Sequence, residues 1–190
     1  STISGGSGND TVELTAAATT ASSTVTGGEG DDSVDWKGTT GGGLYIDGGS
    51  GDDNLEADGN LKDTIVGGLG ADTIDIAAGA AVIWGGSSKF DSADLADSIT
   101  ATDGAVTIFG AAGADTISVG TGKSVVNGGA DGDDITAGAG DHSISGGSGN
   151  DTVTMDDADL TKLDTLSGEA GTDVLEITTL GAAIADEDFT

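Results

Sequence analysis

The sequence predicts an all-β protein folded as a parallel β-roll, a solenoid of about nine turns with 18–25 residues in each turn. Three observations lead to this fold class. A glycine-rich hexamer that ends in Asp recurs along the chain, apolar residues lie at fixed distances from each copy, and the chain contains 36 Gly but no Pro and no Cys.

The hexamers divide the chain into regular units. Their first glycines are separated by 18 to 25 residues and are Gly5, Gly27, Gly48, Gly67, Gly85, Gly110, Gly128, Gly146 and Gly168. Eight of the nine copies have an Asp five residues later: Asp10, Asp32, Asp53, Asp72, Asp115, Asp133, Asp151 and Asp173. Gly and Asp are typical turn residues, so each hexamer is predicted to be a turn between two short strands.

Apolar residues flank every hexamer. One lies two positions before each first glycine, from Ile3 to Leu166, and others lie seven and nine positions after it, as in Ile74 and Ile76. A spacing of two, with polar residues between, is typical of strands that bury one side. One unit of this length cannot bury its own apolar side chains, so we expect consecutive units to stack and bury them as ladders.

The unit at Gly85 departs from the pattern, because Phe90 stands where the other copies have Asp. Its spacing to the next hexamer is 25 residues, seven more than the minimum of 18. We interpret residues 87–93 as an insertion in one turn, which brings Asp97 and Ile99 back into register.

The charge and the residue usage exclude several functions. The chain has 34 Asp and Glu against 5 Lys and Arg, a net charge of −29. We expect no nucleic-acid partner, since such a chain repels phosphate backbones. No apolar stretch is long enough to predict membrane insertion. Without Cys there are no disulfides, so a bound metal is the obvious alternative means of stabilisation.

The stacked turns predict a calcium site. Consecutive turns lie about 4.8 Å apart, which brings each Asp next to the Asp of the neighbouring turn, and such carboxylates repel unless a cation lies between them. Carboxylate and carbonyl oxygens suit Ca²⁺, whereas Mg²⁺ needs a stricter octahedron and zinc prefers His or Cys. The alternative is that the hexamers are plain tight turns, but a turn alone does not require the same Asp in eight of nine copies.

These hexamers resemble the G-G-x-G-x-D-x-U-x repeat of the RTX family of calcium-binding β-rolls, from Gly5 to about Ile177. The resemblance implies calcium sites formed by the hexamer Asp residues and by glycine-turn carbonyls of two stacked turns. The implied ligands are Asp10, Asp32, Asp53, Asp72, Asp97, Asp115, Asp133, Asp151 and Asp173, with Gly5, Gly27, Gly48, Gly67, Gly110, Gly128, Gly146 and Gly168.

The repeat also departs from the family. A typical RTX repeat has nine residues and gives calcium sites at both edges of the roll, whereas here the hexamer recurs about every eighteen residues, so that one edge carries it. We therefore expect about six Ca²⁺ sites, with up to two more at the irregular turn.

No catalytic constellation is recognisable, and we expect no enzyme. The stretch Gly120–Ser124 reads GTGKS, but Ile117 stands where a phosphate-binding loop needs Gly, and a strand is predicted after Ser124. His142 has no nucleophile beside it in the sequence.

Two outward-facing features bear on partners. On one outer face, the residues directly before three hexamers are apolar, namely Val66, Trp84 and Phe109. They form either an interface or a surface that the 87–93 loop covers. The other outer face is lined by acidic residues, namely Glu13, Asp35, Glu56 and Asp75. They form either a solvated surface or a place where a cation bridges two molecules.

Three functions remain open, all for a secreted protein at or outside the cell surface. The composition and the resemblance favour a calcium-dependent structural module of a bacterial surface layer (S-layer), whose partners are copies of itself or other surface components. The alternatives are the stalk of a large RTX adhesin and the non-catalytic RTX roll of an enzyme or toxin exported by type I secretion. Residues 1–190 are read as one module of a longer chain, with an irregular segment at 178–190.

Overall fold

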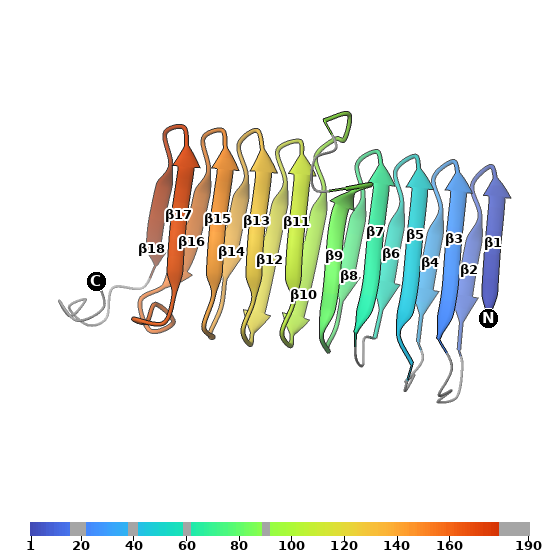
Figure 1. Ribbon diagram of the computed structural model, residues 1–190, viewed down its shortest axis with the longest axis horizontal. Helices are drawn as coiled ribbons and strands as arrows, with labels where there is room; N and C mark the ends of the chain where they lie inside the picture. The colour runs from blue at the N-terminus through green and yellow to red at the C-terminus, as the bar shows by residue number, and fades with distance from the viewer. Residues whose placement is uncertain (16–21, 38–41, 59–61, 89–91, 179–190) are drawn as a thin grey trace.

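The computed structural model describes residues 1–15, 22–37, 42–58, 62–88 and 92–178. These residues form two nine-stranded parallel sheets that pack face to face as the two walls of a solenoid (Figure 1). The first sheet contains β1 (Thr2–Ser7), β3 (Ser23–Glu29), β5 (Leu44–Ser50), β7 (Asp63–Leu69), β9 (Ala81–Gly86), β11 (Thr107–Ala112), β13 (Val125–Ala130), β15 (Ser143–Ser148) and β17 (Thr165–Ala170). The second contains β2 (Thr11–Leu14), β4 (Ser33–Trp36), β6 (Asn54–Ala57), β8 (Thr73–Ile76), β10 (Ser98–Asp103), β12 (Thr116–Thr121), β14 (Asp134–Ala137), β16 (Thr152–Asp156) and β18 (Val174–Thr178).

The register confirms the predicted apolar ladders. Ile46 pairs with Ile65 in the first sheet, and Leu55 pairs with Ile74 in the second. All four side chains are 0 % exposed and belong to one continuous core between the sheets. The core is thin, because each turn contributes few inward side chains, and it becomes exposed in the last turn, where Leu175 is 44 % exposed.

The register after the predicted insertion is restored as the repeat requires. Ile99 pairs with Ile74 on one side and with Ile117 on the other, as predicted. In Figure 1 the segment between β9 and β10 projects beyond the edge that the other hexamers form. Residues 89–91 lie outside the described residues. The predicted irregular segment at 178–190 begins one residue too early, because Thr178 is the last residue of β18, and the rest of that segment also lies outside the description.

The two edges and the two outer faces differ in chemistry. All the hexamers lie at one edge, the upper one in Figure 1, and the remaining connections form the opposite edge. On the second sheet the outward residues Glu13, Asp35, Glu56 and Asp75 are in register with one another, as predicted. On the first sheet, the outward residues of β7 to β15 carry no charge. None of the described residues belongs to a helix that is long and apolar enough to cross a membrane.

Candidate metal centre

The hexamer Asp residues form a continuous hydrogen-bonded column, which we call the Asp ladder: Asp10, Asp32, Asp53, Asp72, Asp97, Asp115, Asp133, Asp151 and Asp173. The backbone N–H of each member donates to Oδ1 of the Asp in the next turn, at N···O distances of 2.7 to 3.1 Å. The ladder passes through the insertion, where Asp72 donates to Asp97 and Asp97 donates to Asp115. One carboxylate oxygen of each acceptor is therefore used to hold two turns together.

The second oxygen of these carboxylates has no hydrogen-bond partner. Oδ2 is buried and unpartnered in every ladder member from Asp10 to Asp151. The interior members are 1 to 3 % exposed, whereas Asp173, at the end of the ladder, is exposed. Buried carboxylate oxygens are normally hydrogen-bonded or bound to a metal, because an unpaired buried charge costs several kcal/mol or more. A row of orphaned oxygens along one edge is thus the clearest sign of an absent ligand.

Backbone oxygens converge on the same places. A Cβ built on the first glycine of a hexamer would overlap both Oδ2 of its own Asp and the carbonyl oxygen of the first glycine in the next turn. At Gly27, for example, these atoms belong to Asp32 and Gly48. The same arrangement occurs at Gly5, Gly48, Gly67, Gly85, Gly110 and Gly128. Gly85, which the sequence-based ligand set omits, therefore belongs with the others.

The hexamer glycines are also needed for backbone geometry. The second and fourth positions have positive φ angles, such as 130° at Gly28 and 113° at Gly30, which non-glycine residues rarely adopt. Three turns adopt this conformation with another residue, namely Ala111, Asp131 and Glu169, at φ angles between 70° and 95°. The motif thus provides the left-handed turn that brings carboxylate and carbonyl oxygens of neighbouring turns together.

Burial of the ladder has a large electrostatic cost. Burial raises the pKa of five ladder carboxyls, from Asp53 to Asp133, above the ordinary value of 3.8, and neighbouring carboxylates raise it further, although the N–H from the preceding Asp lowers it. The pKa rises to about 6 at Asp53, about 7 at Asp72 and at Asp133, about 8 at Asp115 and about 9 at Asp97. At neutral pH these groups need either a proton or a cation.

The donor set fits calcium. Each gap between turns offers a carboxylate oxygen and backbone carbonyl oxygens, which are hard ligands that Ca²⁺ accepts in irregular geometry. Within the described residues, no three His, Cys, Asp or Glu side chains are grouped so as to hold a metal ion, so a calcium site here has to include backbone carbonyls. A bound Ca²⁺ would neutralise the carboxylates, while the N–H···Oδ1 bonds orient them.

The opposite edge uses Asp differently, which the sequence analysis missed. Oδ1 of Asp63 accepts the N–H of Leu44 at 2.9 Å, and Oδ1 of Asp164 accepts the N–H of His142 at 2.7 Å. On this edge, the two acids lie at the corner that corresponds to the Asp corner of the hexamer edge. In the neighbouring turns, the same position is occupied by Leu44 and by His142. A register of the second turns, four residues before each hexamer, would have found them. Among the described residues of this edge, no continuous carboxylate ladder forms.

The predicted interface residues lie together on the outer face of the first sheet. Val66 is in register with Trp84, and Trp84 with Phe109. The two rings are stacked, with centroids 4.5 Å apart and planes inclined by 24°. Val66 does not offer exposed surface as predicted: it is 8 % exposed, because it lies between neighbouring strands beside Trp84. The exposed apolar side chains near the rings are Tyr45, Val82 and Val125.

The two dismissed catalytic motifs have structural places. Gly120–Ser124 comprises the last two residues of β12 and the connection to β13, so the segment after Ser124 is a strand and not the helix of a phosphate-binding loop. His142 is 1 % exposed at the second edge, where its Nε2 lies 3.0 Å from the carbonyl oxygen of Gly138.

Comparison with known proteins agrees with this geometry. The model of the RTX calcium-binding nonapeptide repeat matches residues 1–20, 15–35, 57–87, 92–126, 127–154 and 162–176, which together cover more than half of the chain. No curated protein matches the chain significantly.

We predict that Asp115→Asn weakens calcium-dependent folding. The amide keeps an oxygen that can accept the N–H of Asp97, but it removes the charge that a cation would bind. The calcium concentration at the folding midpoint should rise by roughly threefold to tenfold, measured by far-UV circular dichroism. In chelator the same variant should retain at least as much strand signal as wild type, because a buried charge is gone. Asp75→Asn, the same change on the exposed outer face, is the control; equal midpoints for both variants would contradict a ligand role.

Without calcium, stability should fall as the pH rises. The five ladder carboxyls from Asp53 to Asp133 have an ordinary pKa of 3.8, which the fold raises to about 6 to about 9. Their contribution is therefore fully present below about pH 4 and is lost as the pH passes through about 6 to 9. Far-UV circular dichroism of chelated protein at increasing pH measures the loss of folded chain, which saturating calcium should prevent because the cation binds the ionised form. Chelated protein that becomes more stable towards pH 9 would refute this prediction.

Proposed function

The chain belongs to the RTX family of calcium-binding repeats, and on this premise we propose that it is a calcium-dependent structural module of a bacterial surface layer. Repeats of this family bind calcium and are characteristic of secreted proteins. The observation that carries the proposal is the Asp ladder, whose buried Oδ2 atoms have no partner within the protein. This ladder makes the folded state depend on a cation that is abundant outside cells and scarce inside.

Calcium dependence suits export followed by folding. Extracellular calcium modules typically bind with Kd values of about 10⁻⁴ to 10⁻³ M, well above cytosolic calcium. In the cell, a net charge of −29 and the unneutralised ladder would oppose compaction. Outside the cell, calcium would fill the gaps between turns, and the same chain would fold.

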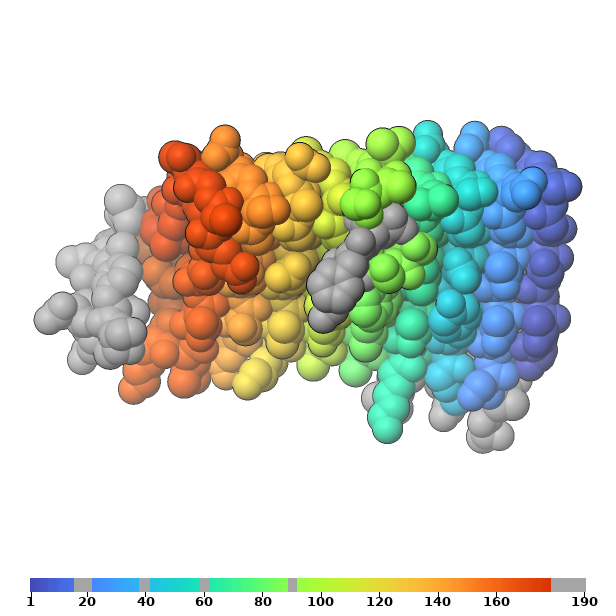
Figure 2. Space-filling view, turned by 45° about the horizontal axis from the view of Figure 1, so that its top comes forward, coloured from blue at the N-terminus to red at the C-terminus, as the bar shows by residue number. Residues whose placement is uncertain are grey.

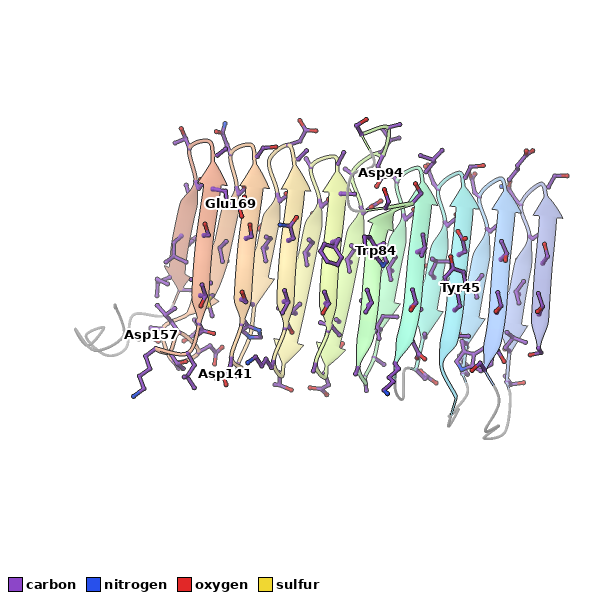
Figure 3. All side chains as sticks on the ribbon, in the orientation of Figure 1. Tyr45, Trp84, Asp94, Asp141, Asp157 and Glu169 are labelled. Carbon is purple, nitrogen blue, oxygen red and sulfur yellow. The ribbon has the colours of Figure 1, made fainter. Side chains whose placement is uncertain are left out.

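The outer face of the first sheet, whose outward residues carry no charge from β7 to β15, supports assembly with further copies of the chain. Tyr45, Val82 and Val125 are 36 to 43 % exposed around the stacked Trp84 and Phe109, and we call these five residues the apolar patch. In Figure 3, Trp84 lies at mid-height on this face and Tyr45 lies nearer the end of the solenoid that contains β1. In an acidic molecule, the face without charge is the one through which two copies can approach with the least repulsion. A second copy is therefore the partner that we propose for the patch.

We predict that Trp84→Ser reduces assembly and leaves calcium-dependent folding unchanged. Trp84 is half-buried on the outer face, so its loss removes apolar contact area from the patch without opening the core. Particle size by light scattering, recorded together with circular dichroism during a calcium titration, separates the two effects. An association constant at least about tenfold weaker is expected for a central aromatic residue.

Leu163→Ser is the matched control, because it removes a 61 % exposed apolar side chain outside the patch. Wild-type protein that folds with calcium but stays monomeric at every concentration would overturn the surface-layer function. That outcome would leave the adhesin stalk and the non-catalytic roll of a secreted enzyme or toxin as the remaining functions.

A further inference from the structure

The insertion brings a second buried carboxylate to the calcium edge. Asp94 lies between the excursion and β10, and its side chain is 7 % exposed. Figure 3 places Asp94 at the hexamer edge, above Trp84. The sequence pattern gave Asp94 no role, because Asp97 already restores the repeat.

Regular turns stack their backbone carbonyls in a column that the insertion interrupts. In those turns, a Cβ on the second glycine would overlap the carbonyl oxygen of the second residue in the turn before, as at Gly28, Gly49, Gly68, Gly129 and Gly147. Gly86 is different: it lacks the positive φ of these glycines, and the nearest atom to its Cβ position is Oδ2 of Asp94, at 2.5 Å. A carboxylate oxygen thus lies against the second residue of this turn, which no other hexamer turn with a second glycine shows.

The strand pairing shows between which two turns the Asp94 carboxylate lies. β7 and β9 pair as far as Gly68 with Gly86, but β9 and β11 pair only as far as Trp84 with Phe109. The regular pairs continue into the hexamer, as β13 and β15 do through Gly129 and Gly147. The Cβ of Ala111 is the next nearest atom to the Cβ position of Gly86, at 3.0 Å. Asp94 therefore occupies the gap between the turn of β9 and the turn of β11.

Asp94 also lies close to the Asp ladder. Among the charges that act on Asp97, the carboxylate of Asp94 is the strongest, and it acts on Asp72 and Asp115 as well. The Oδ2 atoms of Asp72, Asp97 and Asp115 are all buried without a hydrogen-bond partner. The carboxylates of Asp94 and Asp97 repel each other in a buried place, and a shared cation would remove that repulsion.

We propose that Asp94 is an additional calcium ligand, which joins Asp97 to give the turn at the insertion a site with two carboxylates. Calcium affinity rises with the number of charged ligands, so this site should bind more tightly than the sites with a single Asp and should fill first. The insertion then has a function, since it adds a carboxylate to the calcium edge and marks the place where calcium binding begins. This inference depends on calcium binding and not on assembly into a layer.

The experiment is a titration of metal-free protein with Ca²⁺ by calorimetry, and with Tb³⁺ as a luminescent substitute. Trp84 precedes Gly85 directly and can sensitise Tb³⁺ bound at the insertion, whereas Trp36 lies at the end of β4, several turns away. Wild-type protein should show one step that is tighter than the rest, and luminescence should rise with the first equivalent of Tb³⁺.

Asp94→Asn should weaken this first step by about tenfold or more and remove the early luminescence, because one charged ligand is lost. Asp75→Asn, which removes one exposed charge from the second sheet, should leave both unchanged. Asp94→Glu keeps the carboxylate and should retain much of the first step. Circular dichroism at saturating calcium checks that each variant folds.

Two results would overturn the proposal. One is an isotherm for Asp94→Asn that coincides with that of Asp75→Asn. The other is an equal loss of binding or folding in Asp94→Asn and Asp94→Glu, which would mean that the residue only fills space. Neither result would affect the proposed assembly, which is measured by particle size.

Discussion

The column of buried carboxylates at the hexamer edge is the constraint on which the rest of this structure depends. From Asp32 to Asp151, each ladder Asp uses one oxygen to accept the N–H of the Asp in the preceding turn, and its other oxygen is enclosed without a hydrogen-bond partner. Stacking aligns the turns, but it also brings their negative charges close together. The carboxylates that set the register therefore also destabilise the stack. Calcium resolves this conflict, because it converts the repulsion between turns into a shared site.

The remaining parts of the fold offer little that could replace the cation. The core is a thin layer of side chains such as Ile65 and Ile74 between the two sheets, and the chain has no disulfides. Aromatic residues make up 3 % of the sequence, and the stacked pair of Trp84 and Phe109 lies outside the core. A solenoid of this kind is a series of weak units in which each turn contacts only its neighbours, so that ions between turns contribute directly to folding.

Most of the fold could be predicted from the sequence because it repeats. A fixed spacing from hexamer to Asp to Ile determines which side chains face inward, and even the insertion at 87–93 could be placed by restoring the spacing at Asp97 and Ile99. Features that occur only once could not be predicted in this way. The position of Asp94 depends on how the excursion returns, and Asp63 caps a corner that has no constant residue. Val66 faces outward as its position requires, but its neighbours cover it.

The most direct test of this account is the far-UV circular dichroism spectrum of the metal-free protein at neutral pH, before and after the addition of Ca²⁺, with Mg²⁺ as the comparison. The account predicts a largely disordered chain in chelator that gains strand signal cooperatively with Ca²⁺ and far less with Mg²⁺, which demands a stricter geometry. Full strand signal in chelator would contradict it, because the Asp ladder would then be stable at neutral pH without a cation.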